Sequence, residues 1–184
     1  MGRFTLGTLS TVPVSARPDL VAAPVLAALE RLGLADAVGV VEIDAALSDT
    51  AATQEAYDLV GDDLANCVVV AGKREGEERV AACVVLATTR ADINTVVRKR
   101  LDVRKTSFLP MDRAVEESGM EYGGITPFGL PEGWPVLVDS RVAERAVVVV
   151  GSGIRRSKLL VPGRVLAALP AAELVEGLAR PIEP

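Results

Sequence analysis

Short apolar runs separated by polar, glycine-containing segments follow one another along most of the chain. The clearest are residues 66–72 and 79–88, two valine-rich runs joined by the polar segment 73–78. β-Branched residues favour strands, and two such runs around a short polar connector are typical of a β-hairpin. We therefore predict that these runs pair as antiparallel strands. Further strands are predicted at 38–43, 105–109, 136–139, 147–151 and 158–161.

Segments with apolar residues at helical spacing lie between the predicted strands. The segment 20–32 has Pro24 in its first turn, where proline is tolerated, and Gly33 follows its end. Asp92 is placed to cap a second helix that reaches Leu101. Because helices alternate with strands that include a hairpin, the pattern favours a mixed α+β fold over a doubly wound parallel sheet. Additional helices are predicted at 51–60, 110–119 and 162–169.

The length of 184 residues is that of one domain with a substantial core. Pro13 and Pro18 lie among threonine and serine residues, so residues 1–18 are predicted to form an irregular N-terminal arm. No later segment has the composition of a linker between domains. We expect residues 19–184 to form a single domain.

Composition narrows the class of protein. Aromatic residues make up only 3% of the chain, so the core must consist mainly of small branched side chains, which suit a sheet covered by helices. The only cysteines, Cys67 and Cys83, lie in valine-rich runs and are predicted to be buried, reduced thiols. No apolar stretch has the length of a membrane span and the N-terminus lacks a signal-peptide layout, which predicts a cytoplasmic protein without membrane contact.

The chain contains no histidine, which limits its chemistry. Ser-His-Asp and Cys-His catalytic systems and histidine-based metal sites are excluded, and we expect no metal and no cofactor. The net charge of −5 speaks against broad nucleic-acid binding. Basic residues nevertheless cluster at 98–105 and 155–158. Each cluster is either a solvated face or a contact to a phosphate backbone.

Three polar or conformationally permissive points follow one another in the second half of the chain. They are the loop Gly123-Gly124-Ile125-Thr126-Pro127-Phe128-Gly129, Asp139 at the end of a strand, and the turn Gly151-Ser152-Gly153-Ile154-Arg155. Glycine lets main-chain N–H groups approach a ligand closely, and proline holds a loop in one shape. The order of these segments predicts a small pocket at one rim of a mixed sheet.

These segments resemble the motifs of the YbaK/EbsC family, within the prolyl-tRNA editing-domain superfamily of aminoacyl-tRNA deacylases. The GxxxP signature corresponds to Gly123–Pro127, the strand-end aspartate to Asp139 and the glycine turn to Gly151–Arg155, and the resemblance runs from about Ala51 to Leu169. It implies a curved, barrel-like mixed sheet flanked by helices. It also implies a free-standing trans-editing enzyme, which hydrolyses the ester between an amino acid and the terminal ribose of a mischarged tRNA.

Ester hydrolysis develops negative charge on the carbonyl oxygen, so the site needs donors aimed there. The resemblance assigns this task to backbone N–H groups of the two glycine segments. Asp139 then orients a ribose hydroxyl, binds an ammonium group or caps the next turn. The catalytic residues so predicted are Asn66, Gly123, Gly124, Thr126 and Asp139. The predicted substrate-binding residues are Ile125, Pro127, Phe128, Gly151, Ser152 and Gly153, and the predicted tRNA-binding residues are Arg98, Lys99, Arg155 and Lys158.

Asn66 departs from the family pattern, since many members have a lysine at this place on the strand that opens the hairpin. Asparagine donates and accepts hydrogen bonds but cannot neutralise an oxyanion. Three interpretations remain: a deacylase for a small amino acid, a weak or inactive binding module for aminoacyl-tRNA 3′ ends or a small amino-acid-like ligand, and a hydrolase or binder of a non-tRNA ligand. The expected partner is aminoacyl-tRNA, and an aminoacyl-tRNA synthetase is left open as a second partner.

Overall fold

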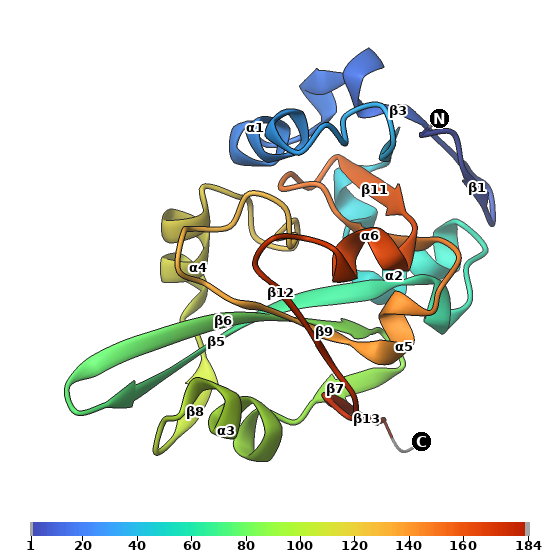
Figure 1. Ribbon diagram of the computed structural model, residues 1–184. Coiled ribbons are helices and arrows are strands. Elements are labelled where there is room, and N and C mark those ends of the chain that lie inside the picture. Colours follow the sequence, from blue (N-terminus) through green and yellow to red (C-terminus); the bar gives the residue numbers. More distant parts are fainter. Residues whose placement is uncertain (1, 183–184) are drawn as a thin grey trace.

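Two β-sheets pack around the main core in the computed structural model, which describes residues 2–182 (Figure 1). The five-stranded sheet has the order β12-β9-β6-β5-β8, and the four-stranded sheet has the order β10-β11-β4-β3. Two further pairs, β1–β2 and β7–β13, lie apart from these sheets. The result is the predicted α+β fold with mixed sheets flanked by helices, although the sheets do not close into a barrel.

The bounds of the elements are as follows. The strands are β1 (Thr5–Leu6), β2 (Leu9–Ser10), β3 (Val12–Pro13), β4 (Gly39–Glu42), β5 (Ala65–Arg74), β6 (Glu77–Leu86), β7 (Thr89–Ala91), β8 (Thr106–Phe108), β9 (Val136–Asp139), β10 (Val148–Gly151), β11 (Ser157–Val161), β12 (Ala172–Val175) and β13 (Ala179–Pro181). The α-helices are α1 (Ala23–Arg31), α2 (Thr50–Ala56), α3 (Arg98–Leu101), α4 (Met111–Ser118), α5 (Ser140–Ala143) and α6 (Gly163–Ala167). Single turns of other helix types are η1 (Val14–Ala16), η2 (Pro18–Leu20), η3 (Ala45–Leu47), η4 (Gly61–Asp63) and the π-helical η5 (Ile93–Val97).

The predicted hairpin is confirmed. β5 and β6 pair antiparallel along their full length, from Ala65 opposite Leu86 to Arg74 opposite Glu77. β6 then pairs in parallel with β9, and β9 pairs in parallel with β12, so the five-stranded sheet is mixed. The run Val80–Leu86 is buried throughout, as a continuous apolar run in a central strand requires.

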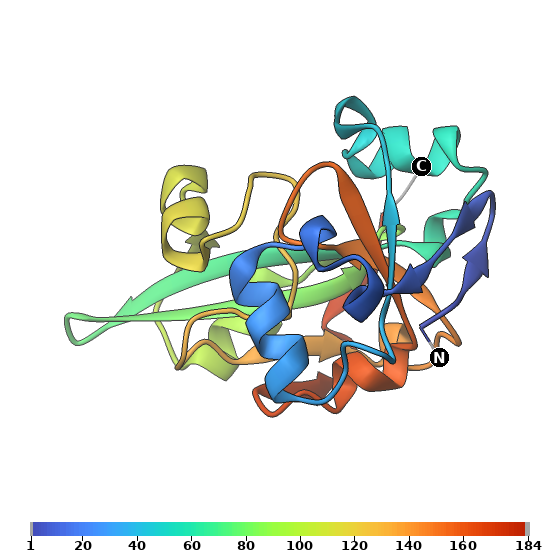
Figure 2. The same ribbon diagram turned by 90° about the horizontal axis from the view of Figure 1, so that it is seen from above.

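The larger core fills the space between the two sheets, and α1 covers it (Figure 2). Val84 and Val138 of the five-stranded sheet meet Val150 and Leu159 of the four-stranded sheet there. A second apolar cluster covers the other face of the five-stranded sheet, where Leu101 of α3 belongs to it. The central strands of the five-stranded sheet are therefore covered on both faces, and valine is the most frequent residue in the main core.

The two sheets touch at the start of the hairpin. Leu64, just before β5, forms an isolated parallel bridge with Val149 of β10. This contact brings the first residues of β5 beside the end of β10, and β11 pairs antiparallel with β10. The rim predicted to carry the pocket is thus assembled from strands that are far apart in the sequence.

Several local expectations were wrong in extent. The helix predicted at 51–60 ends at Ala56, because Asp58 has a positive φ of 54° that a right-handed helix cannot include. The segment 172–181, for which no element was predicted, contributes β12 and β13. Within residues 2–18, three strands of two residues each form, and β3 pairs with β4. Among residues 2–182, no helix combines the length and apolarity needed to cross a bilayer.

Candidate active site

A cavity of ≈ 440 Å³ lies at the rim where β5, β10 and β11 meet the N-terminus of α2 and the loop after α4. Five residues predicted from sequence line it: Asn66, Gly123, Ile125, Gly151 and Lys158. The remaining lining residues are Ser48, Asp49, Thr50, Leu64, Ala65, Cys67, Val68, Tyr122, Val149 and Val150. Small and branched apolar side chains thus form one part of the walls, and the polar groups come from the start of α2 and the residues before it, from β5, from β11 and from the loop after α4.

The side chain of Asn66 is held by α2. Thr50 Oγ1 donates a hydrogen bond of 2.7 Å to Asn66 Oδ1. Asp49 occupies the N-cap position of α2, and the hydroxyl of Thr50, the first residue of the helix, is directed to β5. Since the amide oxygen is already bonded, the amide nitrogen is the group that Asn66 can offer to a ligand.

The two glycine segments pack backbone against backbone. The N–H of Gly153 donates to the oxygen of Gly124 at 2.7 Å, and the N–H of Glu121 donates to the oxygen of Gly153 at 2.8 Å. A Cβ atom on Gly151 would lie 2.4 Å from the oxygen of Gly124, and one on Gly124 would lie 2.9 Å from the nitrogen of Ile154. The two segments can therefore approach this closely only because positions 124 and 151 are glycines.

Some of the backbone N–H groups that were predicted to stabilise an oxyanion are already hydrogen-bonded to backbone oxygens of the protein. Gly124 N–H donates to the oxygen of Glu121 at 2.9 Å, and Gly153 N–H is bonded as described. Ser152 is fully buried, and its hydroxyl lies 2.7 Å from that of Ser157 and donates to the oxygen of Ile154 at 3.0 Å. In this structure the second glycine segment thus braces the first, with only Gly151 on the cavity wall.

Arg155 ties the rim of the cavity together. Its backbone N–H donates to Glu121 Oε2 at 2.6 Å, and its guanidinium donates to the backbone oxygens of Tyr122 and Ala45. The guanidinium also lies 3.7 Å from the Asp49 carboxylate. The arginine therefore joins the loop after α4 to the segment before α2.

Lys158 lies inside the cavity rather than on the surface. Only 8% of the residue is exposed, and its Nζ donates to the backbone oxygen of Ser48 at 2.7 Å. Sequence reasoning grouped it with Arg155 as a contact to tRNA. The signal that could have located it is the strand itself, because Lys158 directly precedes the apolar residues 159–161 of β11, a strand that is buried throughout, and lies opposite Gly151.

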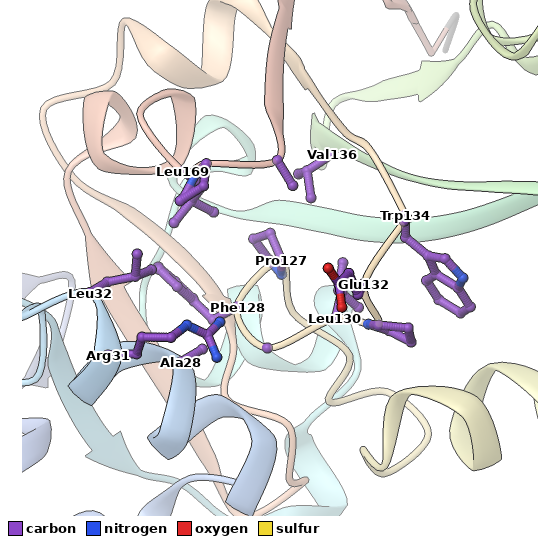
Figure 3. A pocket seen from close by; sticks show the side chains of 15 residues that line it. Ala28, Arg31, Leu32, Pro127, Phe128, Leu130, Glu132, Trp134, Val136 and Leu169 are labelled. Atoms are coloured by element: carbon purple, nitrogen blue, oxygen red, sulfur yellow. The ribbon is translucent and has the colours of Figure 1, made fainter.

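Other predicted residues lie away from this cavity. Pro127 and Phe128 line a separate cavity of ≈ 500 Å³ on the other side of the loop, together with Arg31 of α1 and Trp134 (Figure 3). Thr126 lies in the same loop, between Ile125 and Pro127, and is fully buried. Its Oγ1 has no hydrogen-bond partner among the described residues. Arg98 and Lys99 lie on α3, which is on the opposite side of the β5–β6 ribbon from α2 (Figure 1).

Asp139 is a buried structural junction. Its carboxylate accepts from Arg141 Nε at 2.8 Å, from Arg141 Nη2 at 2.9 Å and from the N–H of Ala179 at 2.9 Å, and it caps α5 through the N–H of Arg141. Burial alone would raise the pKa of Asp139, but these hydrogen bonds and the guanidinium charge hold the pKa below its ordinary value. The carboxylate thereby joins α5 to β13.

Comparison with known proteins identifies the family. A family model for the aminoacyl-tRNA editing domain matches residues 44–169, about two thirds of the chain. The chain belongs to this family, as its resemblance to the YbaK/EbsC proteins implied.

Two solved structures share the fold. The first is the crystal structure of a proposed trans-editing enzyme for prolyl tRNA synthetase, with 20% identity, a TM-score of 0.71 and coverage of 83% of this chain and 93% of that one. The second is the crystal structure of the hypothetical protein APE2540, with 18% identity, a TM-score of 0.74 and coverage of 85% and 99%. At these identities the likeness concerns the fold alone.

Proposed function

We propose that this chain is a free-standing aminoacyl-tRNA deacylase, which hydrolyses the ester of a mischarged tRNA carrying a small amino acid. The observation that carries the proposal is that one cavity combines the family's motifs. Within the matched range 44–169, Gly123 and Ile125 of the GxxxP loop, Asn66 of the hairpin and Gly151 of the glycine turn line the same cavity.

The size and walls of the cavity support a small substrate. Its volume of ≈ 440 Å³ is in the lower part of the range of small-ligand sites, roughly 300–1,000 Å³. Ala65, Val68, Ile125 and Val149 restrict the space for a side chain. The amide nitrogen of Asn66 is available to polar atoms of an aminoacyl ester. Such walls admit a small side chain such as that of alanine, serine or cysteine.

A second candidate is a binding module that recognises the aminoacylated 3′ end without turnover. The specific observation in its favour is the hydrogen bond from Thr50 to Asn66, which fixes an uncharged group at the place where many relatives have a lysine. Loss of one donor to an oxyanion lowers kcat by about 10²–10³-fold. Such a loss would leave binding largely intact.

Deacylation of alanyl-, cysteinyl- and seryl-tRNAs by the wild type and by Asn66→Lys separates the two candidates. Hydrolysis by the wild type supports the deacylase and identifies the amino acid. Hydrolysis by Asn66→Lys alone, with equal binding of a non-hydrolysable aminoacyl-adenosine by both proteins, supports the binding module. If both proteins leave every tRNA intact and bind no analogue, both candidates are wrong.

A further inference from the structure

The side chain of Lys158 reaches the cavity because of the position of this residue in the four-stranded sheet. It lies on β11 between Gly151 of β10 and Val41 of β4. Directly opposite residues of antiparallel strands point to the same face of the sheet. The side chain of Lys158 therefore leaves β11 on the face where Gly151 meets the backbone of Gly124, and it ends at the cavity wall.

The Lys158 ammonium is only partly satisfied by the protein. The ammonium has three N–H donors, and its one hydrogen bond within residues 2–182 is to the backbone oxygen of Ser48. No carboxylate of the described residues forms an ion pair with it; the neighbouring Asp49 is 67% exposed and pairs with Arg155. A buried ammonium without acceptors is costly, so its other donors are directed to whatever oxygen atoms occupy the cavity.

Ser48 provides an independent sign of a polar ligand. The residue is 1% exposed and lines the cavity, yet its Oγ is one of two buried side-chain polar atoms in the described part of the chain that have no hydrogen-bond partner. Buried hydroxyls are normally paired. Two polar groups whose hydrogen-bonding capacity the protein does not fill, the Lys158 ammonium and the Ser48 hydroxyl, thus belong to residues that line the same cavity.

We infer that Lys158 is the group that contacts the carbonyl oxygen of the bound ester and takes up the negative charge that develops on it. This inference rests on the proposed deacylase function. Asn66 lies across the same cavity and contributes an uncharged donor, so the positive charge enters from β11 rather than from the hairpin.

The hydrolysis that Lys158 assists needs no reactant other than the ester and water. A water oxygen adds to the carbonyl carbon, and the electron pair of the C=O bond moves to the oxygen beside the ammonium. The tetrahedral intermediate then re-forms the C=O bond and releases the ribose oxygen, which takes the proton that the water loses. Lys158 stays an ammonium throughout, and its hydrogen bond strengthens as the oxygen becomes charged.

The ionisation of Lys158 makes the inference measurable. Burial, and to a smaller extent the charge of Arg155, lower the pKa of Lys158 to about 8, although the carboxylate of Asp49 partly opposes the shift. The other titratable groups facing the cavity are Tyr122 from the loop and Cys67 from β5, while the strand neighbours Val41 and Gly151 do not titrate. The ammonium is therefore present below about pH 8 and lost above it.

The first experiment is the pH dependence of kcat/KM for the wild type, with the uncatalysed hydrolysis subtracted. This ratio reports the ionisation of the free enzyme. We expect it to fall above about pH 8, and we expect Lys158→Arg, which stays charged, to show no fall in that range. A wild-type ratio that rises through pH 8 would assign the neutral amine a role as a base and overturn the inference.

The second experiment uses Lys158→Met and the matched control Lys73→Met, which changes an exposed lysine near the tip of the hairpin. Folding of both is checked by circular dichroism. Lys158→Met should lower kcat by about 10²–10³-fold, and the control should not change it. An adenosine phosphonate that imitates the charged intermediate should bind Lys158→Met about 10²-fold more weakly, while a neutral amide analogue should lose little affinity.

The outcomes separate this inference from the proposed function. Hydrolysis that is unaffected by Lys158→Met overturns the role of Lys158 and leaves the deacylase standing. Absence of hydrolysis combined with Lys158-dependent binding of the phosphonate overturns the deacylase and retains the contact to a charged oxygen. If the phosphonate binds both variants equally, the contact itself is refuted.

Discussion

The N–H of Gly153 donates to the backbone oxygen of Gly124 at 2.7 Å, so the two glycine segments are joined without any side chain. This bond fixes the loop that forms one wall of the cavity against the turn that follows β10. It also explains why glycine occurs in both segments, because the backbone atoms of each occupy the space that a Cβ of the other would need.

Gly151→Ala should therefore destabilise the protein through a clash between backbone atoms. The new Cβ would lie 2.4 Å from the oxygen of Gly124 and 2.7 Å from that of Ile125, and both are backbone atoms rather than ends of flexible side chains that could move away. We expect a loss of about 1–3 kcal/mol in the free energy of unfolding, measured by urea denaturation. A matched control is Gly76→Ala in the hairpin turn, where no atom lies within 4 Å of the new Cβ and only the positive φ of 88° opposes the change. A loss at Gly151 no greater than that at Gly76 would contradict the close approach.

The sequence predicts well those parts of the fold that depend on local pattern. The hairpin, α1 and α4 follow from apolar spacing and from Pro24 and Gly119 at their ends. β12 could not be predicted, because its stabilising contact is a parallel pairing with β9, more than thirty residues earlier.

The candidate site could also be predicted only in part, because part of it depends on contacts between segments that are far apart in the sequence. The order of the glycine segments pointed to Gly123, Ile125 and Gly151, and the family resemblance added Asn66. All four residues line one cavity. The burial of Lys158 depends on its partner across the ladder and on the segment before α2, which no local pattern reveals. The mutual hydrogen bonds of the glycine segments are likewise a product of tertiary packing.

Thr50→Val should release Asn66 from its fixed orientation. The substitution keeps the shape of the side chain and removes the 2.7 Å hydrogen bond to Asn66 Oδ1. We expect a loss of about 1 kcal/mol in stability and, if the proposed deacylase activity holds, a fall of about tenfold in kcat/KM. Thr95→Val, at an exposed position on η5, is the control and should change neither quantity. Unchanged kcat/KM for Thr50→Val beside a clear loss for Asn66→Ala would show that Thr50 does not orient the amide.

Cys67 and Cys83 should stay unlinked even in oxidising solution. Val68 is the residue opposite Cys83, so the adjacent Cys67 points to the other face of the hairpin. Burial raises the pKa of Cys83 to about 12 and also raises the pKa of Cys67, so both thiols are almost wholly protonated at pH 8. We expect alkylation by iodoacetamide at pH 8 to be at least about tenfold slower in native than in urea-unfolded protein. Peptide mass spectrometry after treatment with diamide provides the second readout, and a native peptide pair linked through these cysteines would refute the assignment to opposite faces.

Asp139→Asn should remove part of the pH dependence of stability. Because the pKa of Asp139 in the folded protein is below its ordinary value, the carboxylate stabilises the fold above the unfolded-state pKa, which is about 4. That stabilisation is lost as the pH falls from about 4 through the folded-state pKa. At pH 7 we expect the substitution to cost about 2–3 kcal/mol, the scale of hydrogen bonds to a charged group, since Arg141 and Ala179 lose an ionised acceptor.

Urea denaturation of the wild type and of Asp139→Asn between pH 7 and pH 3 checks this expectation. The difference between the two should shrink as the pH falls below about 4, because the wild-type carboxyl also becomes neutral there. Asp112→Asn, at an exposed position in the first turn of α4, is the control and should cost less than about 1 kcal/mol at pH 7, the scale of a charge near a helix N-terminus. A difference that is the same at pH 7 and pH 3 would mean that the shape of the Asp139 side chain, and not its charge, joins α5 to β13.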